Sequence, residues 1–302
     1  MNAIINDVNR RQEFVLLFDV KDGNPNGDPD AGNLPRVDPE TMQGLVTDVC
    51  IKRKVRNFVD MTIGKEEGMR IYVQNKGFAL NDLHQEAYDD LKIKSTGTKQ
   101  KRDEVERTQS WMCKNFYDVR MFGAVMTTGV NCGQVRGPVQ LSFARSINQV
   151  VPLDISITRV AITKSEDAKV VETDAAATGG KRTEMGRKAL LPYGLYKAYG
   201  FITPHFAQDT GVSEADLELF WSALQNMWDL DRSASRGMMA CRGIYIFTHE
   251  STIGNAPAHE LLERVKVTRK EDVESARSFD DYIVSVNDNN LPEGVKLSAI
   301  GV

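Results

Sequence analysis

The stretch Glu13-Phe-Val-Leu-Leu-Phe-Asp-Val20 decides the fold. It is short, almost wholly apolar and rich in residues that favour β-structure, which is typical of a central strand buried on both faces. The stretch that follows is Lys21-Asp-Gly-Asn-Pro-Asn-Gly-Asp-Pro-Asp30. Its glycines allow positive φ, its prolines fix φ, and its Asn and Asp side chains bond their own backbone. The chain therefore leaves a buried strand through a sharp polar loop.

A basic helix is predicted after this loop. Asp38 can accept hydrogen bonds from free backbone N–H groups, Pro39 suits a first helical position, and Glu40 favours the positive end of the helix dipole. From this entry to Asp60, the helix would bury two apolar stripes, first Met42, Leu45, Val46 and Val49, then Ile51, Val55, Phe58 and Val59. The cations Lys52, Arg53 and Arg56 would form either a solvated face or a phosphate-binding face.

The composition gives no overall positive charge that would indicate nucleic-acid binding. The 302 residues are 41% apolar with a formal charge of −4, so the chain can bury a full core as one large or two smaller domains, and any nucleic-acid site must be a local patch. Residues 1–11 lack the apolar core of a signal peptide and no run could span a bilayer, so we expect a cytoplasmic protein without membrane partners. The four cysteines lie far apart, which favours reduced core thiols over a zinc site or disulfides.

The rest of the chain alternates strands with helices. A capping box at Ser213-Glu-Ala-Asp216 begins an amphipathic helix that runs to about Asp229. A shorter helix is predicted at 81–91, and strands at 70–74, 138–143, 153–162, 244–248, 264–268 and 282–286. One further strand is predicted within the aromatic-rich stretch 192–206. Polar residues 92–107 and flexible residues 163–190 indicate two projecting insertions. This pattern predicts an α+β sandwich, with helices on one face of a mainly antiparallel sheet.

Several enzyme motifs are only partly matched by this sequence. Asp22-x-Asn24-x-Asn26-Gly27 begins like a calcium loop, but Asn33 replaces the final Glu and Pro25 interrupts it. Gly180-Lys181 lacks the first glycine and the Ser/Thr of a phosphate-binding loop. The carboxylates after the first strand, Asp19, Asp22, Asp28 and Asp30, could hold Mg²⁺ for phosphodiester cleavage, or they could only form turns, so a metal-dependent nuclease stays open as an alternative.

The residues also carry a resemblance that covers nearly the whole chain. Its motifs are Phe18-Asp-Val-x-Asp-Gly-Asn-Pro-Asn-Gly-Asp-Pro-Asp-Ala-Gly-Asn33, Pro35-Arg36, Gly44–Val49 with Lys52–Arg56, Asp118–Gly123, Gly133-Gln-Val-Arg-Gly-Pro-Val139, Pro192–Tyr196, Asp231–Gly237 and His249–His259. Together they resemble the Cas-seven backbone subunits (Csd-type, RAMP superfamily) of type I-C CRISPR Cascade complexes.

The resemblance implies a modified RRM-like, ferredoxin-like palm spanning 1–302, with inserted fingers at 64–112 and a thumb at 163–190. It implies an RNA-binding, antiviral subunit that polymerises along the CRISPR RNA (crRNA) in a helical filament and presents this guide for pairing with target DNA. The expected partners are crRNA, the target DNA strand, further copies of the chain, and other Cascade subunits of the Cas-five and Cas-eight types.

The resemblance also implies roles for particular residues. Lys52, Arg53 and Arg56 inherit the guide contact of the first helix, and Arg36 and Arg136 lie within the shared motifs. The thumb contact passes to Lys181, Arg182, Arg187 and Lys188. Backbone subunits of this type are not expected to be enzymes, so no catalytic residue, metal or cofactor is implied. Protein contacts to guide phosphates would be independent of sequence, because base pairing reads the target.

Overall fold

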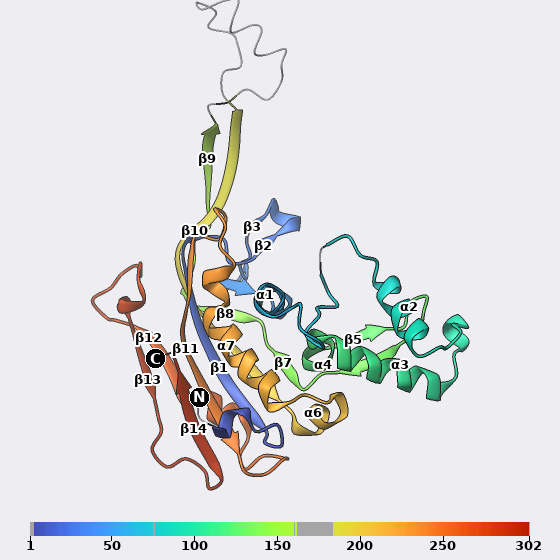
Figure 1. Cartoon of the computed structure of the whole chain (residues 1–302). Helices are drawn as coiled ribbons and strands as arrows, with labels where there is room; N and C mark the ends of the chain where they lie inside the picture. The colour runs from blue at the N-terminus through green and yellow to red at the C-terminus, as the bar shows by residue number, and fades with distance from the viewer. Residues whose placement is uncertain (1–2, 75, 160, 162–183, 302) are drawn as a thin grey trace, which may run out of the picture.

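The fold is built on one antiparallel sheet, seen in a computed structural model that describes residues 3–301 except 75, 160 and 162–183 (Figure 1). Along the sheet the strand order is β14-β11-β1-β10-β8-β4, and β7 and β9 also pair with β10. These strands are β1 (Gln12–Gly23), β4 (Gln43–Val46), β7 (Val139–Leu141), β8 (Ala144–Gln149), β9 (Leu153–Arg159), β10 (Glu184–Ile202), β11 (Met238–His249) and β14 (Val295–Ile300). Three small two-stranded sheets add β2 (Gly27–Asp28) with β3 (Leu34–Pro35), β5 (Gly123–Met126) with β6 (Gly133–Arg136), and β12 (Val265–Arg269) with β13 (Tyr282–Val286).

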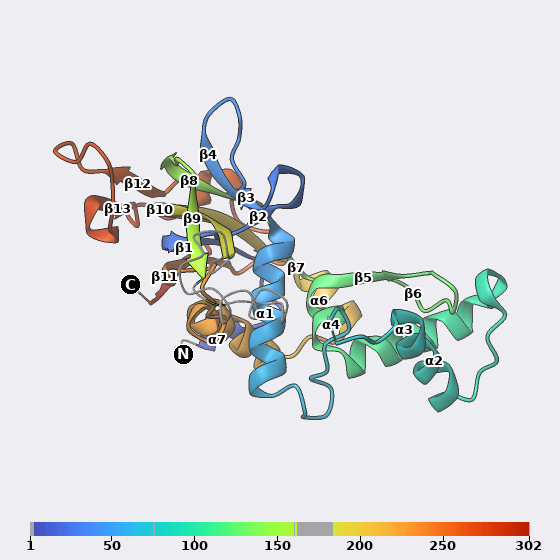
Figure 2. The ribbon, with the colours of Figure 1, turned by 90° about the horizontal axis from the view of Figure 1, so that it is seen from above.

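Two long helices cover one face of the sheet, and they cross close together in both views (Figures 1 and 2). They are α1 (Asp48–Thr62) and α7 (Glu214–Leu230). Among the described residues, the other α-helices are α2 (Leu80–Asp90), α3 (Arg102–Asn115), α4 (Tyr117–Phe122), α6 (Pro204–Thr210) and α8 (Ala258–Leu262). Short 3-10 turns there are η1 (Ala3–Asn6), η2 (Pro29–Ala31), η3 (Gly97–Lys99) and η4 (Phe279–Asp281). The predicted α+β class, with two helices on a mainly antiparallel sheet, is confirmed.

β1 lies at the centre of the sheet, as its apolar run predicts. It pairs with β10 on one side and β11 on the other, and residues 12–20 are all buried. Phe14, Leu16 and Phe18 pack beneath α1 and α7, whereas Val15 and Leu17 pack against α8 on the opposite face. Burial on both faces explains why this strand does not alternate between apolar and polar residues.

The second long helix begins where the sequence predicts. Ser213 Oγ accepts a hydrogen bond from Asp216 N, and the Asp216 carboxylate accepts one from Ser213 N, which completes a capping box. The predicted stripe, Leu217, Phe220, Trp221, Leu224, Met227 and Trp228, is buried in the main core. Trp221 meets Phe14 edge to face, with 5.1 Å between ring centroids.

The predicted start of the first helix at Asp38 is wrong. The Asp38 carboxylate instead accepts hydrogen bonds from Glu40 N and Thr41 N in a turn, and Met42 has φ +56°. Residues 43–46 then form β4, which pairs with β8. The helix begins after Thr47, whose Oγ1 accepts a hydrogen bond from Cys50 N. The predicted apolar stripe of Met42, Leu45, Val46 and Val49 therefore does not form on one helix, because only Val49 lies in α1. Val49 is 64% exposed.

The strand predicted at 70–74 is also absent. Arg70 makes a single bridge to Phe116, and the backbone N–H groups of Tyr72 and Val73 donate to the Asp118 carboxylate. A side chain thus satisfies donors that a neighbouring strand would otherwise satisfy. In addition, the prediction missed the C-terminal strand β14, which pairs with β11.

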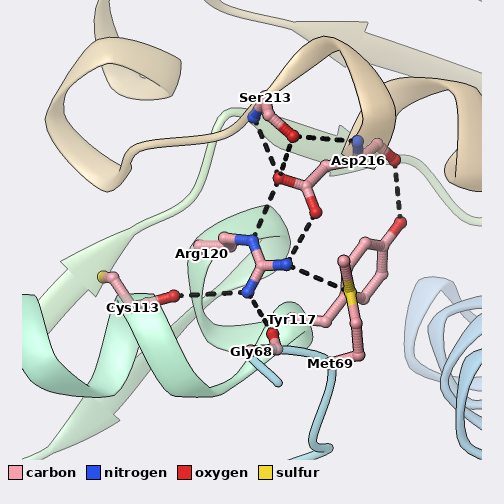
Figure 3. A network of polar contacts seen from close by, with 7 residues as sticks. All are labelled: Gly68, Met69, Cys113, Tyr117, Arg120, Ser213 and Asp216. Carbon is pink, nitrogen blue, oxygen red and sulfur yellow. Dashed lines mark hydrogen bonds and ion pairs between the residues drawn. The ribbon is translucent and has the colours of Figure 1, made fainter. Parts of the chain in front are cut away.

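The insertion after α1 forms a cluster beside the sheet (Figure 2). Side chains of α2, α3, β5 and β6 share a separate apolar core that runs from Tyr72 to Val135, beyond the predicted boundary at 112. At the base of this cluster, Arg120 of α4 forms an ion pair with Asp216 of α7 (Figure 3). The pair ties the insertion to the helical layer of the sheet.

A long hairpin rises from one end of the sheet (Figure 1). Its arms are β9 and the first part of β10, paired from Leu153–Leu190 to Arg159–Glu184. The residues between Ala161 and Glu184, which include most of the predicted thumb, lie outside the described part of the chain.

Candidate nucleic-acid interface

A polar cleft of about 380 Å³ opens beside the N-terminal half of α1. Three segments meet there: the loop after β1, the first turns of α1 and the loop after α7. Its lining residues are Asn24, Pro25, Asn26, Gly27, Asn33, Thr47, Val49, Cys50, Arg53, Lys54, Asp231, Ser235 and Arg236. The cleft lies at the polar end of β1, directly after the stretch that organises the sheet.

Close backbone contacts hold the two loops together. Asn24 N donates to Ser235 O at 2.7 Å and so joins the two loops, while Asn24 Nδ2 donates to Asn33 O at 2.7 Å within the loop after β1. Gly237 has φ +60°, and a Cβ there would lie 2.4 Å from the carbonyl oxygen of Asp22. Only glycine fits such a crowded left-handed position, so the loop after β1 and the loop after α7 form one wall.

The N-terminus of α1 is fixed by the loop after β1. Asn26 Oδ1 accepts from both the N–H and the hydroxyl of Thr47, each at 3.0 Å. Thr47 in turn caps the helix. The Asn-rich loop therefore does more than turn the chain, because it sets the position of the helix end that faces the cleft.

Three cations line the cleft with one carboxylate. Asp231 accepts from Lys54 Nζ at 2.7 Å and also pairs with Arg236. Arg53 has no carboxylate partner within the described residues, and its Nη1 donates to Val73 O at 2.6 Å. Burial, followed by the charge of Arg56, lowers the pKa of Arg53, but a guanidinium stays charged at neutral pH. The cleft therefore carries net positive charge from its lining side chains.

The three predicted helix cations lie in different surroundings. Lys52 is partly exposed and pairs with Asp48 at 3.2 Å, one helical turn away. Arg53 lines the cleft. Arg56 is buried, and its Nε donates to Asp118 at 2.7 Å. The structure thus brings Lys52 and Arg53 to the surface of α1 and turns Arg56 into the core.

The remaining predicted contacts are spread widely. Arg36 pairs with Asp28 at 3.4 Å near the cleft, and Arg136 stacks over Phe206 with 4.4 Å from its guanidinium carbon to the ring centroid. Arg187, on the hairpin, is largely exposed and pairs with Asp154. Lys188 is half-buried on the same arm, whereas Lys181 and Arg182 lie outside the described residues. Direct RNA contact stays a prediction for all of them.

The carboxylates after β1 are held by the fold. Asp19 Oδ2 accepts from Arg242 Nε at 2.8 Å and from the Tyr193 hydroxyl at 3.0 Å. Burial raises the pKa of Asp19, while Arg242 and Tyr193 oppose that rise. Asp28 caps the short η2 turn. Within the described residues, no group of three His, Cys, Asp or Glu side chains is placed to hold a metal ion.

Sequence reasoning missed Asn26, Lys54 and Arg236 as parts of this site. The signal was present, because the segment Asp231–Gly237 and the loop after β1 were both singled out as motifs. Their meeting across the chain depends on α7 returning to the end of β1, which spacing along the sequence does not reveal.

Comparison with known proteins identifies the family. The model of the family described as CRISPR-associated protein Cas7 matches residues 10–287. The chain belongs to this Cas7 family. The curated CRISPR-associated protein Cas7 of Haloferax volcanii is 26% identical over 306 residues, which cover 92% of this chain and 81% of that protein.

Two solved chains are also similar. One, from a CRISPR RNA-guided surveillance complex, pre-nicking, has a TM-score of 0.49 and 15% identity, with 78% of each chain covered. Another, from a CRISPR RNA-guided surveillance complex, has a TM-score of 0.46 and 16% identity, with 83% of this chain and 74% of that chain covered. As for membranes, none of the helices described here has the length and apolar character that crossing a bilayer requires.

Proposed function

We propose that this Cas7 family protein is a crRNA-binding backbone subunit of a type I-C CRISPR interference complex. The observation that carries the proposal is the basic cleft at the N-terminal half of α1, built from loops that lie within the residues matched by the Cas7 family model. In this proposal many copies lie side by side along one guide RNA. Each copy holds the backbone of the guide, so that its bases stay free to pair with a target DNA strand.

The chemistry of the cleft suits phosphates rather than bases. Arg53 supplies a cation from the lining of the cleft, and Lys52 adds one from the same helix outside the lining, where it pairs with Asp48. The positive end of the α1 dipole adds to them. Lys54 and Arg236 are partly neutralised by Asp231, so they hold the wall in shape and contribute less net charge. Arg56 supports α1 from within, through Asp118. Such contacts bind any guide sequence about equally.

The same proposal assigns a role to each part of the fold and names the partner subunits. The sheet with α1 and α7 serves as the RRM-like palm, the insertion from about 64 serves as fingers, and the β9–β10 hairpin carries the thumb over the guide. Cas-five and Cas-eight type subunits would complete the cytoplasmic complex. The protein would bind and present nucleic acid without a reaction of its own.

The alternative, a metal-dependent RNA endonuclease, requires carboxylates free to bind a metal ion. Asp19 is committed to Arg242, and Asp28 to η2 and Arg36, which favours a structural role for these acids. Substitution separates the two functions. Loss of complementary-RNA cleavage in Asp28→Ala or Asp30→Ala, with guide binding retained, would favour the nuclease.

The direct test is purification of the full chain from cells that express a CRISPR array. We expect it to carry small RNA of uniform length that matches the array, and Lys52→Ala/Arg53→Ala to carry much less. The control Lys266→Ala/Lys296→Ala removes two exposed cations from distant strands and should retain the RNA. RNA of random length and sequence, or none, would contradict the proposal.

A further inference from the structure

A second pocket lies at the same end of β1, on the opposite face of the sheet. It has a volume of about 140 Å³ and lies between the base of the β9–β10 hairpin and the β12–β13 connection. Its lining residues are Asn148, Gln149, Val150, Val151, Pro192, Tyr193, Gly194, Leu195, Arg269, Ser275, Ala276, Arg277 and Tyr282. Tyr193 and Leu195 pack with Tyr282, whereas Tyr196 packs in the core beneath α1 and α7, so the pocket faces away from these helices.

The charged residues of the β12–β13 connection are divided between the pocket lining and the surface outside it. The connection from 269 to 281 contains five carboxylates, Glu271, Asp272, Glu274, Asp280 and Asp281, and none of them lines the pocket. Its two arginines, Arg269 and Arg277, both line it. Neither guanidinium has a carboxylate at ion-pair distance among the residues that the structure describes. The charged side chains that this acidic segment contributes to the pocket lining are therefore both cations, which indicates a site for an anion.

The walls of the pocket are preorganised. The turn that carries Arg277 is fixed, because Arg277 N and Ser278 N both donate to Asp281 Oδ2 at 2.6 and 2.9 Å. Arg242 lies over the Phe279 ring and is itself neutralised by Asp19. The Tyr193 and Tyr282 rings pack with centroids 6.3 Å apart. Arg277 Nη1 donates to the carbonyl oxygen of Ala276 at 2.9 Å, and neither arginine has a carboxylate partner among the described residues. The turn and the packed rings thus give both arginines a fixed base, which lowers the cost of binding.

The size and donors of the pocket fit one phosphate group. Its volume holds a compact anion but not a nucleobase with its sugar. Guanidinium groups bind phosphate oxygens in pairs, and two further lining residues, Ser275 and Tyr282, carry hydroxyl donors. An acidic protein segment offers the same charge, but position favours nucleic acid. Pocket residues Tyr193 and Gly194 pair with Lys21 and Val20, a few residues before Asn24 enters the guide cleft.

We propose that this pocket binds a backbone phosphate of single-stranded RNA, as a second contact separate from the cleft on α1. The inference rests on the proposed function in one respect, since it takes the protein to bind RNA. RNA that passes over this end of β1 would be held on both faces of the sheet. The arginines, and not the bases of the RNA, would determine the affinity.

The test measures binding of the full chain to short oligouridylate over a range of salt concentrations. Arg269→Gln/Arg277→Gln should weaken binding several-fold and make the salt dependence shallower by about 0.7 log units per log unit of salt, as expected for one phosphate. The matched control Lys266→Gln/Lys270→Gln removes the same charge from the same hairpin, outside the pocket. It should leave both the affinity and the slope near those of the parent protein.

A third variant keeps both arginines. Ser275→Glu places a carboxylate beside them, and it should reproduce the loss seen with Arg269→Gln/Arg277→Gln. Circular dichroism and thermal unfolding of each variant separate this effect from misfolding. The affinity for oligodeoxythymidylate, measured in parallel, should fall by a similar factor in these variants, because the pocket contacts only the phosphate group.

Each outcome has a distinct meaning. If Lys52→Ala/Arg53→Ala weakens oligouridylate binding and the pocket variants do not, the second contact is refuted and the proposed function stands. If neither Lys52→Ala/Arg53→Ala nor Arg269→Gln/Arg277→Gln weakens oligouridylate binding, the proposed function itself fails. If the pocket variants leave RNA binding intact but reduce self-association in sedimentation, the pocket holds an acidic segment of another copy, and the RNA proposal is overturned.

Discussion

Asp216 and Arg120 form a bidentate ion pair between α7 and α4, with Nη2–Oδ1 and Nε–Oδ2 distances of 2.6 and 3.1 Å (Figure 3). Both side chains are buried, at 3% and 7% exposure. The same carboxylate caps α7 through Ser213, and Arg120 Nη1 donates to the carbonyl oxygen of Gly68 at 2.6 Å. One ion pair thus joins the N-terminal cap of α7 to the base of the insertion.

Neutralising Asp216 should therefore destabilise the whole chain. Asp216→Asn keeps an oxygen for the helix cap but leaves the buried charge of Arg120 without its partner, which costs about 3 kcal/mol of unfolding free energy. Urea unfolding measures the change. The control is Arg102→Gln in the exposed Arg102–Glu106 pair, which should change stability by less than about 0.5 kcal/mol. Equal stability of both variants would contradict a structural role for the Arg120–Asp216 pair.

Arg56 should act on stability more than on binding. Its partner Asp118 is 1% exposed and also accepts from the N–H groups of Tyr72 and Val73. Arg56→Ala leaves that carboxylate uncompensated and should cost about 3 kcal/mol. Arg53→Ala, which removes one hydrogen bond to Val73 O, should cost about 1 kcal/mol. Thermal unfolding of the two variants compares them, and an Arg56→Ala protein as stable as the parent would refute this assignment.

These contacts show what could be read from the sequence. β1 and α7 were predictable because periodicity and a local capping box specify them within a few residues. The start of α1 was not predictable, because Asp38-Pro39-Glu40 has the chemistry of a helix cap. Only the pairing of β4 with β8 shows that the residues after this cap form a strand before the helix begins. The burial of Arg56 depends on Asp118, 62 residues away. Lys54 was overlooked for the same reason, since its partner is Asp231.

The cysteines should react slowly in the folded protein. Burial raises the pKa of Cys113, Cys132 and Cys241 to about 11, so their thiolate fraction at about pH 8 falls to roughly one in a thousand. Because only the thiolate reacts, alkylation by iodoacetamide should speed up about tenfold per pH unit below 11. Unfolding in guanidinium should speed it up by about two orders of magnitude. Mass mapping of the alkylated peptides tests this, and rapid labelling of any of the three in native protein would contradict it.

The arms of the hairpin should become protected on assembly. Leu153, Ile155 and Ile157 expose 40–50% of their surface on β9, and a projecting two-stranded arm is only marginally stable. Hydrogen exchange of residues 153–159 and 184–190 should be fast in the isolated chain compared with β1. It should slow markedly once copies assemble on RNA. Unchanged exchange in the assembly would argue against a hairpin that closes over the guide.

The salt dependence of RNA binding should report directly on Lys52 and Arg53. Each phosphate that a cation neutralises contributes about 0.7 log units of affinity per log unit of salt for a single strand. Lys52→Ala/Arg53→Ala should therefore make the slope per copy shallower by about 1.4, and by the same amount for guides of unrelated sequence. Arg56 stays intact in this variant, so the fold keeps its Asp118 ion pair. A normally folded double variant with the slope of the parent would place the guide elsewhere and leave these two cations as the solvated face of α1.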